Sequence, residues 1–162
     1  MKQLVETLSA LLAERHMTLS AAESCTGGLI AKSMTDRSGA SGVFRGGVVS
    51  YVNDVKRNVL GVAQQTLDAH GAVSEIVARA MAEGCRKLCG SDLAVSVTGV
   101  AGPDRDDRGN RVGTVYIALA HEGGTICRLF AFGEEKSREE IRTAAAWEAL
   151  DMARRYLAGE KL

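Results

Sequence analysis

Segments typical of strands alternate with segments typical of helices along this chain, and the alternation limits the fold more than any other feature. The leucines between positions 4 and 12 repeat at helical spacing, whereas the segments 46–52 and 92–99 have the β-branched composition of strands. Amphipathic helices between strands bury their apolar faces against a sheet. The alternation therefore predicts an α/β sandwich with a mixed sheet.

The expected elements follow this alternation to the end of the chain. Ser74 and Ser137 are expected to cap the helices that follow them, and Asn53 to cap the short helix that it opens, because their side-chain oxygens can accept from free main-chain N–H groups. Two strand-like segments flank a Gly-rich turn near the C-terminus, so at least one strand is antiparallel to its neighbour. Helices are expected at 2–15, 28–35, 53–60, 71–88 and 137–158, and strands at 17–24, 46–52, 92–99, 113–120 and 125–132.

Composition sets limits on domains, partners and cofactors. The 162 residues argue for one domain over 1–162, and the equal numbers of basic and acidic residues, 20 each, argue against a nucleic-acid partner. No apolar run approaches the roughly 18 residues of a membrane span, and the amphipathic N-terminus is unlike a signal peptide. We therefore expect no membrane partner and a cytoplasmic location. The four cysteines lack metal-ligand spacing, so we expect neither a metal nor another cofactor.

The stretch AESCTGG, residues 22–28, lies between an expected strand and an expected helix. It has three interpretations: a catalytic turn, a phosphate cradle, or a tight strand-to-helix connection. Ligands collect at the carboxyl ends of strands in α/β sheets. Glycines permit close backbone approach, and free N–H groups at a helix start favour an anion. A phosphate is therefore the natural ligand of such a turn.

The candidate nucleophiles are one thiol and two serines. Cys25 would need a base, and the sequence ties none of the three histidines to it. Tyr51 ends an expected strand, and Lys56 lies in the helix that follows. A lysine near a tyrosine can lower the tyrosine pKa, or can itself lose a proton when it is desolvated. Either group can then deprotonate a serine, for which Ser41 in a glycine-containing loop and Ser24 are the candidates.

Four motifs follow one another along the chain: AESCTGGLIA, GGVVSYVNDVK, HGAVSEIVARAMAEG, and VSVTGVAGPD continued by RVGTVYIAL. Through them residues 3–157 resemble the family of CinA C-terminal domains, whose stand-alone members include nicotinamide mononucleotide amidohydrolases of the PncC type. The resemblance implies a three-layer α/β/α sandwich with a mixed, mostly parallel sheet and no metal. It also implies an amidase that converts nicotinamide mononucleotide to nicotinic acid mononucleotide and ammonia, a step of pyridine-nucleotide recycling.

The resemblance also implies roles for individual residues. Ser41, activated by Lys56 and Tyr51, is expected to attack the carboxamide, and the reverse assignment with Ser24 attacking stays open. The first motif is then interpreted as mainly a binding turn, with its N–H groups and hydroxyls on the mononucleotide phosphate. The implied substrate-binding residues are Ser24, Thr26, Gly27, Gly28, Thr98, Gly99, Arg138 and Arg142.

One loop departs from the family pattern. Arg105 stands where the family usually has a glycine, and Arg111 precedes Val112 where a proline is frequent. The departure keeps two other hypotheses open: a catalytically silent nucleotide-binding or regulatory domain, and an amidase for another amide. CinA proteins proper carry a large N-terminal domain, which we do not expect in this chain. The expected partners are a small-molecule nucleotide and a second copy of the chain, since small enzymes often form closed symmetric pairs.

Overall fold

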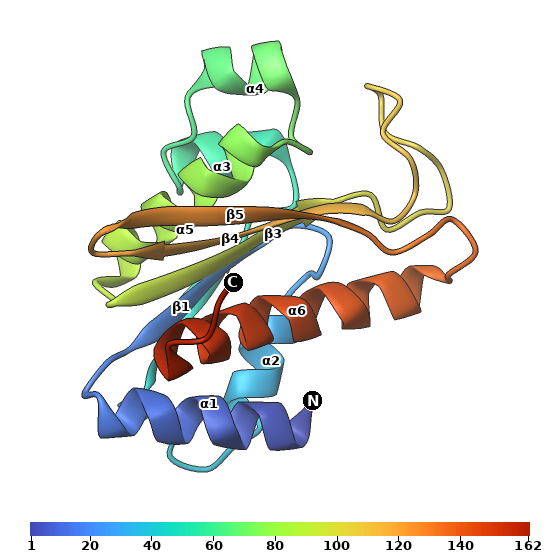
Figure 1. Ribbon diagram of the computed structural model, residues 1–162. Coiled ribbons are helices and arrows are strands. Elements are labelled where there is room, and N and C mark those ends of the chain that lie inside the picture. The colour runs from blue at the N-terminus through green and yellow to red at the C-terminus, as the bar shows by residue number, and fades with distance from the viewer.

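A computed structural model describes residues 1–162 as five strands in one sheet with helices on both faces (Figure 1). The strand order is β2-β1-β3-β4-β5, in which β2-β1 and β1-β3 pair in parallel, while β3-β4 and β4-β5 are antiparallel. The strands are β1 (Leu19–Glu23), β2 (Phe44–Val49), β3 (Leu93–Gly99), β4 (Thr114–His121) and β5 (Gly124–Ala131). The mixed sheet predicted from the sequence is confirmed.

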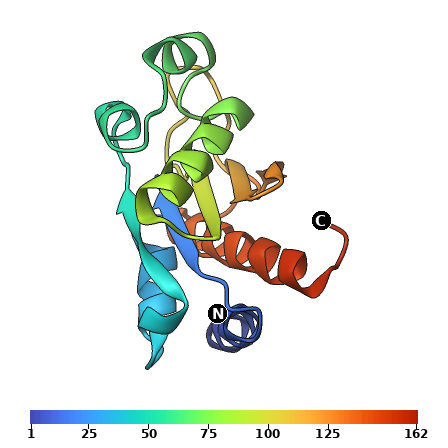
Figure 2. The ribbon, with the colours of Figure 1, turned by 90° about the vertical axis from the view of Figure 1, so that its left-hand side faces the viewer.

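The helices form a layer on each face of the sheet. On one face lie α1, α2 and α6, which contact one another, and on the other lies α5, with α3 and α4 beyond it (Figures 1 and 2). These helices are α1 (Lys2–Glu14), α2 (Leu29–Thr35), α3 (Asn53–Asn58), α4 (Gln64–His70), α5 (Glu75–Cys89) and α6 (Arg138–Ala158), and a short 3-10 helix covers Ala40–Gly42. The three-layer α/β/α sandwich implied by the resemblance is confirmed.

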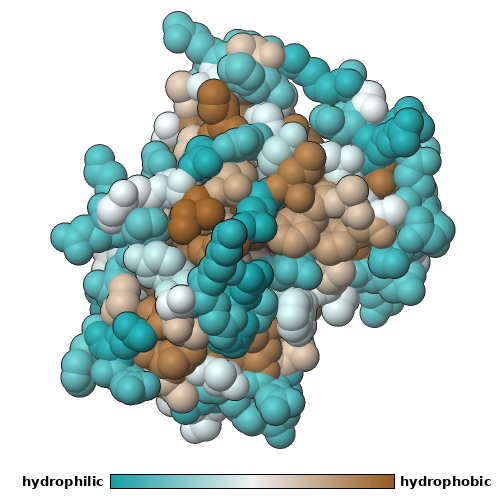
Figure 3. All heavy atoms as spheres, viewed as in Figure 1, coloured by the Kyte–Doolittle hydropathy of each residue, from teal (hydrophilic) through white to brown (hydrophobic).

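The main core lies between the sheet and the layer formed by α1, α2 and α6. It is a cluster of 26 buried residues, and a cluster of eight packs between the sheet and α5. Strand β1 lies at the centre of the parallel part and is buried along its whole length. Hydrophobic residues also gather on the surface over the edge strand β5 (Figure 3). No helix has the length and apolar character needed to cross a membrane.

Two of the three helix N-caps predicted from the sequence are confirmed, and one is wrong. Ser74 accepts from the Val77 N–H, and Ser137 forms a capping box with Glu140. The prediction that Asn53 caps α3 is wrong, because Asn53 is already the first helical residue and the cap position is Val52.

Strand β2 ends earlier than predicted, and α4 was not predicted at all. The chain leaves the β2 ladder at Ser50 because the carbonyls of Ser50 and Tyr51 turn toward the side chain of Lys56.

Gly84 provides a test of the packing between α5 and the segment before α4. A Cβ at this position would lie 1.9 Å from the Leu60 carbonyl oxygen, so Gly84→Ala must displace backbone. We expect it to lower the free energy of unfolding by about 2 to 3 kcal/mol, the cost of overpacking. Gly42→Ala is the matched control, since nothing lies within 4 Å of its Cβ position. Urea denaturation of both variants makes the measurement, and equal stabilities would contradict the packing argument.

Candidate functional site

A cleft of about 190 Å³ lies where the carboxyl ends of β1 and β3 meet the segment that follows β2. Glu23, the last residue of β1, is opposite Val49 on β2 and Val97 on β3, so the polar residues after these strands converge on one edge of the sheet. The predicted site residues in the lining are Ser24, Tyr51, Lys56, Thr98, Gly99 and Arg138.

Lys56 is the centre of this cleft. Its side chain enters from α3 and is buried, with only 1% of the residue exposed. The amine donates to the Ser24 hydroxyl at 3.1 Å, to the Ser50 carbonyl at 2.7 Å and to the Tyr51 carbonyl at 3.4 Å. Burial lowers the pKa of Lys56 to about 8, because desolvation penalises the ammonium form. About a tenth of this amine is therefore neutral at pH 7 and able to accept a proton.

Ser24, rather than Ser41, is the serine that the structure brings to Lys56. Ser24 directly follows β1, and its main-chain N–H donates to the Val97 carbonyl, which fixes it against β3. Ser41 is exposed in the 3-10 helix that precedes β2. Lys56 follows β2, whose six residues span roughly 20 Å. Ser41 thus lies at the opposite edge of the sheet, and the hypothesis that Lys56 activates it is wrong.

Tyr51 contacts Lys56 through its main-chain carbonyl and Arg138 through its hydroxyl. Its carbonyl accepts from Lys56, whereas its hydroxyl accepts from the Arg138 guanidinium at 2.8 Å. The tyrosine side chain is largely exposed at the mouth of the cleft. The predicted activation of a serine by the Tyr51 hydroxyl does not fit this arrangement, because the hydroxyl bonds to neither serine.

The N–H groups at the start of α2 are not free to bind a phosphate, because an internal anion already accepts from them. The Glu23 carboxylate is buried and accepts from the N–H groups of Gly28, Ile30 and Ala31 at 3.0, 3.0 and 2.8 Å. Sequence reasoning passed over Glu23, which lies six residues before the first residue of α2, too far for a local capping signal to identify it. The predicted contacts of Thr26, Gly27 and Gly28 with a phosphate are therefore not supported.

Gly27 and Gly28 are needed for the shape of this turn. Their φ angles are +60° and +98°, a left-handed region in which side chains are strained. The Thr26 hydroxyl is buried without a hydrogen-bond partner and does not line the cleft. The main-chain N–H of Cys25, a residue that lines the cleft, donates to no other residue.

Cys25 lines the cleft beside Ser24, but its thiol is poorly suited to attack. Only 5% of the residue is exposed, and burial raises its pKa to about 11. At neutral pH the group is a thiol, whereas the thiolate is the nucleophilic form. The structure places no histidine in the lining.

Thr98 and Gly99 form the floor of the cleft and also have structural roles. The Thr98 hydroxyl donates to the Ala72 carbonyl at 2.8 Å, which ties the segment between α4 and α5 to β3. A Cβ at residue 99 would lie 2.7 Å from the Thr114 carbonyl oxygen, so packing against β4 alone requires glycine there.

Two arginines of α6 extend the site beyond the cleft. Arg138 donates to the Tyr51 hydroxyl and to the Gly102 carbonyl, while Arg142 donates to the carbonyls of Cys25 and Thr26. Both line a neighbouring hollow of about 320 Å³, which adjoins the cleft at Arg138. Glu139 also lines this hollow, so an anionic ligand group there would meet two guanidinium groups and one carboxylate.

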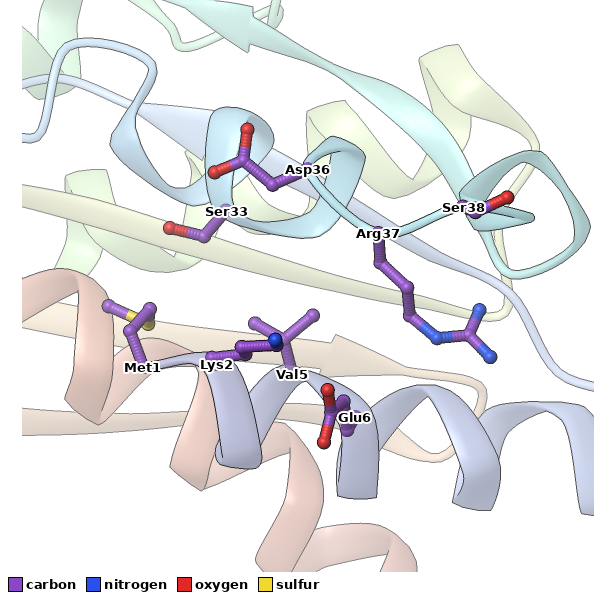
Figure 4. Close-up of a pocket in the computed structure, with 8 residues that line it drawn as sticks. All are labelled: Met1, Lys2, Val5, Glu6, Ser33, Asp36, Arg37 and Ser38. Atoms are coloured by element: carbon purple, nitrogen blue, oxygen red, sulfur yellow. The ribbon is translucent and has the colours of Figure 1, made fainter.

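Another hollow, of about 440 Å³, lies between the start of α1 and the end of α2 (Figure 4). Its charged side chains are Lys2, Glu6, Asp36 and Arg37, and Asp36 already pairs with Lys32 at 2.6 Å. It contains no buried base beside a hydroxyl, so we do not assign the chemistry to it. The structure gathers no group of three or more His, Cys, Asp or Glu side chains able to hold a metal ion.

The chain matches the family model described as CinA C-terminal domain over residues 1–157. A CinA-like protein of Geobacter sulfurreducens is 50% identical over 150 residues, which are 93% of this chain and 36% of that protein. A CinA superfamily protein of Klebsiella pneumoniae has a solved structure with a TM-score of 0.93 at 32% identity, covering 98% of both chains. A competence/damage inducible protein of Agrobacterium tumefaciens gives a TM-score of 0.89 at 38% identity, over 93% of this chain and 92% of that one. The chain spans 38 or 39% of the length of the longer curated relatives from Symbiobacterium thermophilum and Caldanaerobacter subterraneus.

Proposed function

Because the chain belongs to the family of CinA C-terminal domains, we propose that its cleft hydrolyses the carboxamide of nicotinamide mononucleotide to nicotinic acid mononucleotide and ammonia. The observation that carries the proposal is the hydrogen bond between the buried Lys56 amine and the Ser24 hydroxyl. In such a pair the serine is the nucleophile and the desolvated lysine is the base, and the pair needs neither a histidine nor a metal. The CinA-like names of the relatives state no reaction, so the assignment to this substrate is our inference.

The proposed reaction begins when neutral Lys56 takes the proton of Ser24. The Ser24 oxygen attacks the carboxamide carbon, and the carbonyl oxygen becomes an oxyanion. The main-chain N–H of Cys25, which lines the cleft directly after Ser24 and donates to no other residue, is the donor that we propose for it. Lys56 then gives the proton to the amide nitrogen. The C–N bond breaks, ammonia departs, and the acyl group stays on Ser24 as an ester. Water, deprotonated by Lys56, hydrolyses that ester and releases the carboxylate.

The charge distribution supports an anionic substrate placed with its amide toward Ser24. Arg138 and Arg142 lie on the side of the cleft toward α6, whereas the Glu23 carboxylate occupies the N–H groups of the turn. A phosphate is therefore attracted to the arginines and is kept from the turn. The cleft of about 190 Å³ is smaller than the roughly 300 Å³ of common ligand pockets, so a mononucleotide would also use the hollow at the arginines.

The direct test is ammonia release from nicotinamide mononucleotide, with nicotinamide and nicotinamide riboside as substrates that lack the phosphate. We expect release from the mononucleotide and at least about tenfold lower kcat/KM for the riboside, since each lost charge-assisted contact costs more than 1.4 kcal/mol. Binding without release would favour a silent nucleotide-binding domain. Release from the controls alone would favour an amidase for another amide.

Replacing the two serines separates the nucleophile from the exposed hydroxyl. Ser24→Ala should lower kcat by at least about 10³-fold, because the attacking atom is removed. Ser41→Ala is the matched control and should keep kcat within about twofold, since Ser41 lies at the other edge of the sheet. Steady-state kinetics on both folded variants make the comparison. The reverse pattern would return the attack to Ser41.

The pH dependence follows from the pKa of Lys56. The base must be neutral, and its pKa is lowered to about 8, so kcat/KM should rise with pH and level off above about 8. Below that pH, kcat/KM should fall about tenfold per pH unit as the ammonium form takes over. Lys56→Met should lose at least about 10²-fold in kcat, whereas Lys87→Met, at an exposed lysine, should keep both rate and profile. A profile that falls with rising pH would exclude Lys56 as the base.

Cys25→Ala tests whether the neighbouring thiol takes part. A buried thiol with a raised pKa contributes packing rather than attack, so we expect kcat within about tenfold of the parent. Loss of roughly 10⁴-fold in a folded variant, checked by circular dichroism, would instead indicate thiol chemistry.

A further inference from the structure

Glu23 is a buried carboxylate with no cationic partner. Only 1% of the residue is exposed, and no lysine or arginine pairs with its side chain. Burying an unpaired charge costs several kcal/mol unless hydrogen bonds compensate. Three main-chain N–H groups provide that compensation here, so the charge is held by the very segment that follows Ser24.

Those three bonds clamp the turn that carries Ser24. They join residue 23, at the end of β1, to residues 28, 30 and 31 at the start of α2. Between the two ends, the Gly27 N–H donates to the Ser24 carbonyl and the Leu29 N–H to the Thr26 carbonyl. The position of Ser24 and of the Cys25 N–H after it therefore depends on a closed loop of bonds that begins at Glu23.

The main chain of Glu23 also reaches the other member of the proposed catalytic pair. Its carbonyl accepts from the Ser50 N–H at 2.8 Å, and the Ser50 carbonyl accepts from the Lys56 amine at 2.7 Å. One residue thus fixes the serine through its side chain and supports the lysine through its backbone.

We infer that Glu23 is a positioning residue: its carboxylate holds the turn of residues 24–28 so that the Ser24 hydroxyl meets the Lys56 amine. The inference rests on the proposed function only where the test measures kcat. A carboxylate suits the task better than an amide, because both of its oxygens accept, while a glutamine places an NH₂ group against one of the three N–H donors. Misplacing a nucleophile by about 1 Å can cost about 10²-fold in rate.

Glu23→Ala should therefore lower kcat about 10²-fold with KM changed less than about threefold, since substrate binding at the arginines is untouched. Formate should restore kcat at least about tenfold, because it can occupy the vacated carboxylate position, whereas chloride at equal ionic strength should not. Ser24→Ala should show no formate rescue. Glu23→Gln keeps the side-chain shape and should lose about tenfold, which provides a milder variant if Glu23→Ala folds poorly.

Leu12→Ala in α1 is the destabilised control, since it empties a fully buried position of the core while no residue of α1 lines the cleft, so its kcat should stay within about twofold well below its Tm. A substrate-independent readout is the titration of Lys56, followed by NMR of lysine labelled at Cε. Loosening the turn admits water, so in Glu23→Ala the pKa of Lys56 should rise from about 8 toward 10.5, and formate should reverse the rise.

Folded Glu23→Ala with parental kcat and an unchanged Lys56 titration would overturn the inference. An equal loss of kcat in Leu12→Ala, at equal stability, would also overturn it. If the parent releases no ammonia from nicotinamide mononucleotide, the proposed function fails, and the titration alone decides the role of Glu23.

Discussion

The arrangement of this site depends on one buried amine that has no anionic partner. Lys56 is almost fully buried, and three neutral oxygens, rather than a carboxylate, accept its hydrogen bonds. A carboxylate at that distance would favour the ammonium form and raise the pKa, whereas burial among neutral acceptors lowers it to about 8. Burial thus makes the amine a weaker base but leaves part of it neutral at neutral pH, whereas a surface lysine is almost fully protonated there.

The parallel part of the sheet makes this burial possible. Because β1 lies between β2 and β3, the residues that follow β1 and β2 leave the sheet at the same edge and on neighbouring paths. β1 and β2 approach so closely that a Cβ at Gly47 would lie 2.7 Å from the Ala21 carbonyl oxygen. This close pairing brings Ser24 and the carbonyls of Ser50 and Tyr51 around one amine, although Lys56 is 32 residues from Ser24.

The sequence predicted those parts of the structure that depend on local patterns. The alternation of helix-like and strand-like segments was sufficient for the α/β class and the mixed sheet, whereas the three layers were implied by the resemblance. A serine before a helix start was sufficient for the caps at Ser74 and Ser137. Lys56 was identified because a lysine after a strand can be desolvated. Its partner could not be identified, since the choice between Ser24 and Ser41 depends on which edge of the sheet each one occupies, and this is set by pairing between distant segments. The short helix α4 has no strong apolar period and was missed for that reason.

Glu23 explains why the first motif was correctly predicted to bind an anion, although the anion it binds is not a phosphate. Glycines and free N–H groups at a helix start do favour an anion, and the turn does bind one, but the anion is the protein's own carboxylate. Because the Glu23 carboxylate fills the anion position at the start of α2, the positive charges that line the cleft are those of Arg138 and of Lys56 when Lys56 is protonated. In the reaction proposed above, the phosphate of the substrate would therefore bind on the side of the cleft toward α6, and the amide would face Ser24. The Glu23 carboxylate and the two arginines would then favour the same orientation, because the carboxylate repels a phosphate from the start of α2 and the arginines attract it.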